Sequence, residues 1–389
     1  LEAGPTRRTS LQPPQFLADP MDAALEELAF LARYASLDPM EEFGGLVQVQ
    51  VALEFETGEP EQPCRVTARL TDPLTERDGP VVFEADDIDA REPLALALPT
   101  GHYRIRVTQP GNRLAELVRR YDQRGRSHRE RVVLRTADAV RAGMRRVDAG
   151  TMTRHALIQR PADTSDTDDT LALELGPFLI DESPVTNGEY AAFLDATDHQ
   201  APLAWANMPR PDDWDQRPVA WVSLHDARRY AEWAGKRLPT ASEWFFAVSG
   251  SDLRRFPWGD DPSRLTDDML DVLGLGAPHY PFGPLVTDAE RHAWYLTQAR
   301  PVGATPAPLR GPNGIDGALG GLAEWTETHP IDTVDDSLRA GGAVRVVGVP
   351  CFRGLDTLRA KGLADNVWFD PGKRLIDVGF RCVRSLPTD

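Results

Sequence analysis

RPVAWVSLHDARRYAEWAGKRLPTASEWFFAV, residues 217–248, carries the strongest local signals in the chain. Ser223 is placed to cap a helix, and one face of that helix carries Ala227, Tyr230, Ala231 and Ala234. Gly235 then ends the helix, because glycine readily adopts the left-handed conformation found at helix ends. Thr240 begins the next helix, and Glu243 three residues later completes a capping box. The stretch therefore predicts two short, capped helices joined by a tight loop.

Four further blocks flank this stretch in the sequence. They are FLIDESPVTNGEYAAFL (178–194), FPWGDD (256–261), RPVGATPAPLRGPNGIDGALGGLAEWTE (300–327) and PGKRLIDVGFRCVRS (371–385). In the first of these, a strand ends at Pro184 and Thr186 caps a helix. That helix is expected to bury one face, formed by Tyr190, Phe193 and Leu194.

The five blocks, in this order, closely resemble the formylglycine-generating enzyme (sulfatase-modifying factor) family over residues 144–389. The resemblance implies an α+β fold of the C-type-lectin-like class. Because each belongs to a block, we expect the tryptophans to pin irregular loops to the core: Trp233, Trp244, Trp258 and Trp325. We expect the acidic residues of the blocks to cap helices or to pair with Lys236 and Arg237: Asp181, Asp226, Glu243 and Glu324.

The chain before residue 144 divides into four further segments. Residues 1–20 are proline-rich and are expected to form an extended arm, and residues 21–45 carry a helical apolar pattern. From Val47 to Phe55 apolar residues alternate with polar ones, and similar short runs follow, so residues 46–110 predict a small all-β sandwich. Residues 111–143 are rich in arginine and read as a solvated connector with one strand at 132–134.

Composition restricts the classes of partner. The formal charge of -17 over 389 residues argues against sequence-independent binding of nucleic acid, which requires a basic face. No apolar run is long enough to span a membrane. Three widely spaced cysteines form neither a disulfide framework nor a metal-binding pair of the Cys-x-x-Cys type, which favours a cytoplasmic location.

The resemblance also states which catalytic groups to look for. Formylglycine-generating enzymes oxidise a substrate cysteine with O₂ and copper(I), which two cysteine thiolates hold. The corresponding positions here carry Arg353 and Leu358, and neither side chain binds copper. The related ergothioneine-pathway enzymes bind iron through histidines spaced H-x-x-x-H, and no pair of histidines here has that spacing. We therefore expect no catalytic residues, with a divergent oxidase as the alternative.

Calcium is the one metal that the resemblance leaves open. The family's aspartate and asparagine ligands align with Gly317 and Gly321, which supply no side-chain oxygen. Asn313, Asp316 and Glu324 remain as weak candidates, whereas Ca²⁺ takes about six to eight oxygen ligands. No other cofactor is expected.

The C-terminal segment 345–385 departs most from the family. Large apolar and charged residues replace its usual asparagines and serines, and we assign the binding surface to Phe352, Arg353, Asp356, Trp368, Phe369, Lys373, Leu375 and Ile376. The segment resembles the hypermutated C-terminal region of diversity-generating retroelement variable proteins, in which template AAC codons give a restricted set of residues. That resemblance implies a non-enzymatic, hypervariable binding protein of bacterial origin. A module of fixed specificity is the alternative.

Clustered aromatic residues with an arginine are typical of protein interfaces, so we expect a protein partner for this surface. The N-terminal sandwich is expected to be the part through which the chain associates with a larger system.

Overall fold

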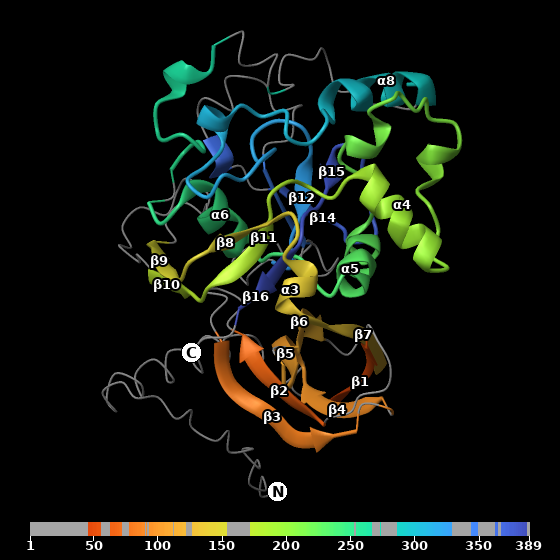
Figure 1. Cartoon of the computed structure of the whole chain (residues 1–389), viewed down its shortest axis with the longest axis vertical. Helices are drawn as coiled ribbons and strands as arrows, with labels where there is room; N and C mark the ends of the chain where they lie inside the picture. Colours follow the sequence, from red (N-terminus) through yellow and green to blue (C-terminus); the bar gives the residue numbers. More distant parts are fainter. Residues whose placement is uncertain are drawn as a thin grey trace, which may run out of the picture. The chain divides into compact units, whose positions relative to one another are not determined.

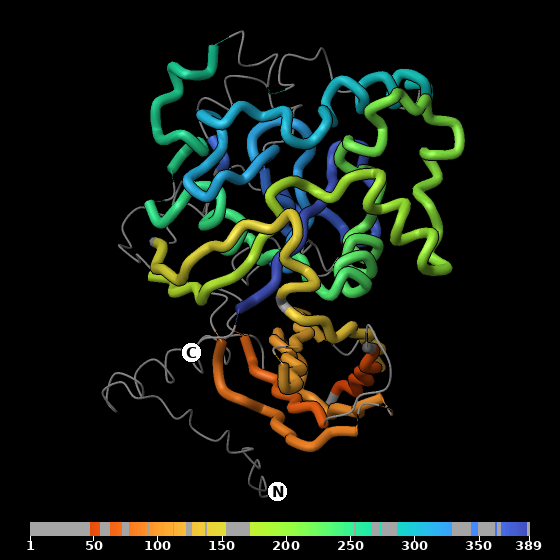
Figure 2. Tube along the Cα trace, viewed as in Figure 1, coloured from red at the N-terminus to blue at the C-terminus, as the bar shows by residue number. Residues whose placement is uncertain are grey.

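In the computed structural model, the chain forms two compact units, which are described separately. The described residues are 46–55, 63–71, 78–89, 91, 93–111, 113–121, 127–153, 172–252, 254–266, 273, 286–328, 344–348, 362–364 and 367–386. The expected extended arm and N-terminal helix lie outside these ranges. Figures 1 and 2 trace both units in the order of the sequence. Within the described residues, no helix is long and apolar enough to cross a membrane.

The first unit is all β and spans residues up to 134 apart from a short insertion at 73–76. Its strands form a seven-stranded sheet in the order β3-β2-β5-β6-β7-β1-β4. They are β1 (Leu46–Phe55), β2 (Cys64–Thr71), β3 (Asp78–Ile88), β4 (Leu94–Pro99), β5 (Gly101–Gln109), β6 (Arg113–Tyr121) and β7 (Ser127–Thr136). The alternating pattern is confirmed at Val47, Val49 and Val51, which are at most 1% exposed.

The prediction of a solvated connector at 111–143 is wrong, because β6 and β7 belong to this sheet. The arginines that suggested a connector are held by carboxylates on neighbouring strands. Arg119 on β6 lies 3.4 Å from Glu130 on β7, and Arg131 on β7 donates to Glu54 on β1 at 2.6 Å. Cross-strand ion pairs of this kind let charged residues occupy a sheet.

The second unit is α+β, as predicted, and contains three small sheets. The first pairs β9 (Gly150–Thr153) with β10 (Ala172–Leu175), and the second has the order β16-β11-β8, from Val383–Ser385, Phe178–Asp181 and Met144–Val147. The third has the order β14-β13-β12-β15, from Val367–Phe369, Val344–Val347, Ala323–Trp325 and Val378–Gly379. Figure 1 shows long connections between these strands.

Short helices complete the second unit. The α-helices are α3 (Ala137–Val140), α4 (Asn187–Ala196), α5 (Leu224–Trp233), α6 (Ala241–Ser249) and α8 (Asp288–Gln298). The 3₁₀ helices are η2 (Leu203–Ala206), η3 (Trp214–Gln216), η4 (Pro262–Arg264), η5 (Ala307–Leu309) and η6 (Gly362–Ala364).

The predicted helix starts are confirmed. The side chains of Thr186, Ser223 and Thr240 each accept a hydrogen bond from the backbone N–H of the third helical residue. The carboxylate of that third residue accepts one from the backbone N–H of the capping residue, so all three are complete capping boxes. The same arrangement begins α8 at Thr287. Gly235 has a φ of +68° and ends α5, as expected.

Two aromatic-rich clusters form the core of the second unit. Trp325 lies in one and Trp244 in the other, and both are 0% exposed. Each indole N–H has a partner: Trp325 donates to the Val222 carbonyl at 2.9 Å, and Trp244 donates to Glu324 at 2.9 Å. Trp233 and Trp258 are half-buried against these clusters, so the predicted structural role of the four tryptophans is confirmed.

We expect Trp244→Ala or Trp325→Ala to lower the free energy of unfolding by about 3–5 kcal/mol, because each removes a buried ring and leaves a cavity. Denaturant unfolding followed by circular dichroism measures the change. Leu203→Ala is the control, since Leu203 is 89% exposed and its loss leaves no internal cavity. An unchanged midpoint for both tryptophan variants would contradict the core assignment.

Candidate functional site

The candidate site is the described part of the expected binding surface, namely strand β14 and residues 370–377, which we call the C-terminal loop. β14 is an edge strand of the four-stranded sheet, where it pairs antiparallel with β13. Phe352, Arg353 and Asp356 lie outside the described residues. The site therefore rests on five of the predicted residues: Trp368, Phe369, Lys373, Leu375 and Ile376.

The two aromatic residues of β14 are half-buried, so they are neither fully displayed nor fully internal. Phe369 packs against the core, with its ring centroid 6.5 Å from that of Trp325. Trp368 is in register with Arg345 on β13, and successive residues of a strand point to opposite faces. Trp368 and Phe369 therefore lie on opposite faces of this small sheet.

The C-terminal loop divides into exposed and buried positions. Asp370, Lys373 and Arg374 are exposed, and Leu375 is half-buried against the core. Ile376 is only 7% exposed and belongs to the core cluster, so the expectation that its side chain lies on the surface is wrong. The exposed part of the loop is thus more polar and more cationic than the sequence suggested.

Main-chain hydrogen bonds hold the C-terminal loop in place. Its carbonyls at Pro371, Leu375 and Asp377 accept bonds of 3.0, 2.9 and 2.8 Å from Leu224, Trp221 and Ala323. A turn at its start is closed by the Asp370 carboxylate, which accepts a bond of 2.7 Å from the Gly372 N–H. A loop fixed by its backbone presents its side chains in a defined geometry.

Arg374 adds an ion pair that ties the loop to α5. Its guanidinium donates to both carboxylate oxygens of Asp226, at 2.8 and 3.0 Å. The same carboxylate accepts from Ser223 in the capping box and lies 3.0 Å from His199 Nε2. Burial opposes the charged form of Asp226, but the hydrogen bonds from Arg374 and Ser223 outweigh burial and lower its pKa.

Our sequence reasoning treated Asp226 as a cap and did not single out Arg374. Asp226 and Arg374 both lie in the sequence blocks that resemble the family. They are 148 residues apart, however, and only the folded chain brings them together.

The calcium candidates each have another partner. Glu324 forms a bidentate ion pair with Arg381, with both bonds at 2.6 Å, and Asn313 donates to the Ala247 carbonyl at 2.8 Å. Asp316 accepts from the backbone N–H groups of Gly303 and Thr305, at 2.6 and 3.3 Å. Glu324 is therefore neutralised by an arginine, and these residues do not fit a calcium site.

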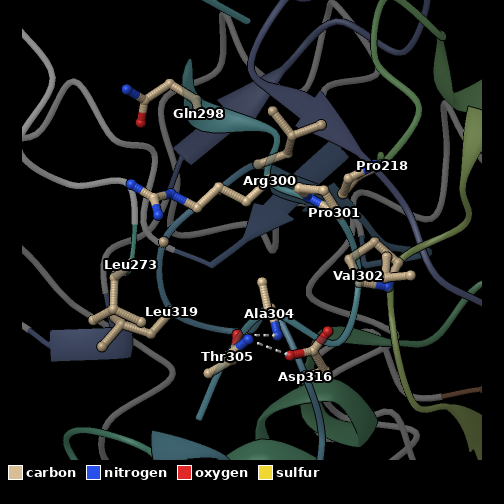
Figure 3. Close-up of a pocket in the computed structure, with 15 residues that line it drawn as sticks. Pro218, Leu273, Gln298, Arg300, Pro301, Val302, Ala304, Thr305, Asp316 and Leu319 are labelled. Atoms are coloured by element: carbon tan, nitrogen blue, oxygen red, sulfur yellow. Dashed lines mark hydrogen bonds between the residues drawn. The ribbon is translucent and has the colours of Figure 1, made fainter. Parts of the chain in front are cut away.

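Figure 3 shows the Asp316 carboxylate pointing toward the backbone of Thr305 at one side of a small hollow. The hollow has a volume of about 40 Å³, room for a few water molecules only.

The described cysteines are not placed for metal chemistry. Cys382 is 0% exposed in the core, and its burial raises the pKa of its thiol well above the ordinary value. Cys64 is 1% exposed inside the first unit. Among the described residues, no three His, Cys, Asp or Glu side chains form a group that could hold a metal ion.

Comparison with known proteins identifies the second unit. The model of the sulfatase-modifying factor enzyme 1-like domain family matches residues 132–386, about two thirds of the chain.

Three curated relatives are 27–36% identical to this chain over spans of 131 to 241 residues. YfmG, an uncharacterized protein of Bacillus subtilis, is 27% identical over 241 residues, which cover 55% of this chain and 47% of that protein. The formylglycine-generating enzyme of Streptomyces coelicolor is 36% identical over 131 residues, 23% of this chain and 41% of the enzyme. The hercynine oxygenase of Mycolicibacterium smegmatis is 30% identical over 187 residues, 40% and 38% of the two chains. This chain spans less than half the length of each of these relatives.

Two solved structures align with about three fifths of this chain. CarF aligns with a TM-score of 0.41 and 17% identity over 63% of this chain and 98% of that chain. Treponema denticola variable protein 1 aligns with a TM-score of 0.40 and 15% identity over 62% and 95%.

The ion pair of Asp226 generates a pH-dependent prediction. We expect Asp226→Asn to lower the free energy of unfolding at pH 7 by about 1–3 kcal/mol, because hydrogen bonds to a charged, largely buried group are lost. The pKa of Asp226 is lower in the folded than in the unfolded chain, so its contribution is complete above about pH 4 and disappears as the pH falls through the folded value.

The difference between wild type and Asp226→Asn in denaturant unfolding should therefore shrink from pH 7 to pH 3. Asp195→Asn is the matched control, since Asp195 is exposed on α4. A difference that stays constant with pH would show that the charge of Asp226 does not stabilise the fold.

Proposed function

Because this chain belongs to the family of sulfatase-modifying factor enzyme 1-like domains, we propose that it uses the family's scaffold for binding and not for oxidation. One observation carries the proposal: the two positions aligned with the family's copper thiolates hold Arg353 and Leu358. Copper(I) requires soft sulfur ligands, which neither residue supplies. The remaining cysteine of the C-terminal blocks, Cys382, is buried and keeps its proton.

Some relatives are named for enzymatic activities, and a divergent oxidase is the competing function. A further argument favours binding. The acidic side chains that could serve chemistry in the described core are instead committed to caps and ion pairs, as Asp226, Glu243 and Glu324 illustrate.

The binding surface is assigned to β14, the C-terminal loop and, from the sequence alone, Phe352, Arg353 and Asp356. Edge strand β14 supplies half-buried aromatic rings, and the loop supplies exposed Lys373 and Arg374. Aromatic and arginine side chains on a fixed backbone are the composition of protein-binding hot spots. A protein is therefore the proposed partner, and the first unit is the proposed means of association with a larger system.

We further propose that the amino-acid sequence of this binding surface is hypervariable. Phe352, Arg353, Asp356 and Leu375 all belong to the residue set that adenine mutagenesis of AAC codons produces, which supports a variable protein. A module of fixed specificity uses the same surface and is the alternative.

The absence of oxidase chemistry is directly testable. We expect no formylglycine when the protein is incubated with a Cys-x-Pro-x-Arg peptide, copper and O₂, because no pair of thiolates is present to hold the metal. Mass spectrometry detects the product. Cys351, two residues before Arg353, is the cysteine nearest in sequence to the aligned thiolate positions. Formylglycine that forms with the wild type and is lost in Cys351→Ser would overturn the proposal.

Binding by the C-terminal loop is tested by photo-crosslinking. We expect p-benzoylphenylalanine at position 373 to give discrete crosslinked adducts in the native host, because Lys373 is exposed on the fixed loop. The matched control places the same group at position 229, where the Arg229 side chain is 53% exposed on α5. Gel analysis and mass spectrometry compare the two. The same adducts from both positions, or none from 373, would contradict the surface assignment.

A further inference from the structure

A second hollow, next to the C-terminal loop, has a volume of about 360 Å³. Its walls come from η2, from the segment between η3 and α5, and from α8, and it is lined by Leu203, Ala204, Asn207, Trp221, Asp288, Arg291 and His292. The Trp221 N–H donates to the Leu375 carbonyl at 2.9 Å, so this cavity adjoins the proposed binding surface. Its volume falls within the range of about 300–1,000 Å³ that is typical of ligand sites.

Trp221 is held in an unfavourable backbone conformation. Its φ is +55°, in the left-handed region, which a bulky aromatic residue rarely occupies. Such strain persists only where the surroundings fix it, and it concentrates at binding and catalytic sites. The hydrogen bond to Leu375 and the packing of the indole provide that constraint here.

The indole of Trp221 forms one wall of the cavity and is backed by other rings. Its ring centroid lies 4.9 Å from that of Tyr295 and 5.9 Å from that of His292, whose side chains are buried. Trp221 itself is only half-buried, although it stands on a packed base. An indole fixed in this way offers a flat apolar surface to an incoming ring.

The rim of the cavity combines one apolar and three polar side chains. Leu203 is 89% exposed, and it is the one large hydrophobic side chain among the described residues that is classed as exposed. Asp288 and Arg291 lie 2.9 Å apart and neutralise each other, and Asn207 is exposed nearby. An apolar wall beside a rim of polar and oppositely charged side chains suits an aromatic side chain whose flanking peptide groups form hydrogen bonds.

We propose that this cavity receives an aromatic side chain of the protein partner, inserted between Leu203 and Trp221. This inference rests on the proposed binding function and names the anchor that the partner supplies. The cavity adjoins the C-terminal loop through Leu375, so one partner reaches both.

The test uses N-acetyl-L-tryptophan amide as the probe and N-acetyl-L-alanine amide as its control, with binding to the full chain followed by saturation-transfer NMR. We expect the tryptophan amide, and not the alanine amide, to bind the wild type. Trp221→Gly should weaken binding about tenfold or more, as loss of an aromatic wall implies. Glycine adopts a φ of +55° freely, so this variant keeps the backbone and is expected to fold, which its melting temperature checks.

Leu203→Ala is the second variant, chosen because an 89% exposed side chain is dispensable for folding, and it should also weaken the probe's binding. Arg229→Ala, which removes a 53% exposed side chain outside the cavity, should leave binding unchanged. No binding to the wild type, or equal binding to Trp221→Gly, would overturn the inference. If the probe test fails but position 373 still gives discrete crosslinks, the proposed binding function stands and only the aromatic anchor is ruled out. The two experiments therefore distinguish failure of this inference from failure of the proposed function.

Discussion

The second unit depends on one buried ion pair, between Glu324 on β12 and Arg381 near the C-terminus. The two side chains are 1% and 0% exposed, and both guanidinium bonds to the carboxylate are 2.6 Å long. Arg381 also donates to the carbonyls of Asp181, Glu182 and Asp316. Trp244 donates to the same carboxylate from α6. Four of the five sequence blocks thus meet at one charged pair, and removing either partner leaves an uncompensated buried charge, which costs about 3–5 kcal/mol.

This ion pair also helps to hold the irregular loops of the unit together. The Arg381 guanidinium supplies the positive charge beside Glu324, and its directional N–H groups donate to the main-chain carbonyls of Asp181, Glu182 and Asp316. Asp316 is stabilised in a complementary way, by the backbone N–H groups of Gly303 and Thr305. Gly317 and Gly321 lie between Asp316 and Glu324 in the sequence. Their φ angles of +67° and +76° allow the chain to turn there, since glycine adopts positive φ readily.

Features that depend on neighbouring residues were predictable from the sequence. Capping boxes at Thr186, Ser223 and Thr240 need only a hydroxyl and a carboxylate three residues apart, and strand alternation needs only a period of two. Features that depend on distant partners were not. The sequence could not reveal that Glu130 and Glu54 would hold Arg119 and Arg131 within a sheet, or that Ile376 would turn into the core. Trp221 was missed because nothing local marks a residue with a positive φ.

The way in which the C-terminal loop is anchored determines which of its positions can vary. Pro371, Leu375 and Asp377 are held through their carbonyl oxygens, which every amino acid provides. A change of side chain at 373, which is exposed, therefore leaves these bonds intact. Positions 374 and 376 are different, because the fold uses the guanidinium of Arg374 and the buried volume of Ile376. A binding surface can tolerate changes in sequence only at positions whose side chains do not stabilise the scaffold. In this loop, hydrogen bonds to main-chain carbonyls provide much of that stabilisation. The strained Trp221 depends on the same arrangement, since its N–H bonds to the carbonyl of Leu375 and not to a side chain. The hydrogen bond that holds Trp221 beside the cavity therefore does not depend on the side chain at position 375.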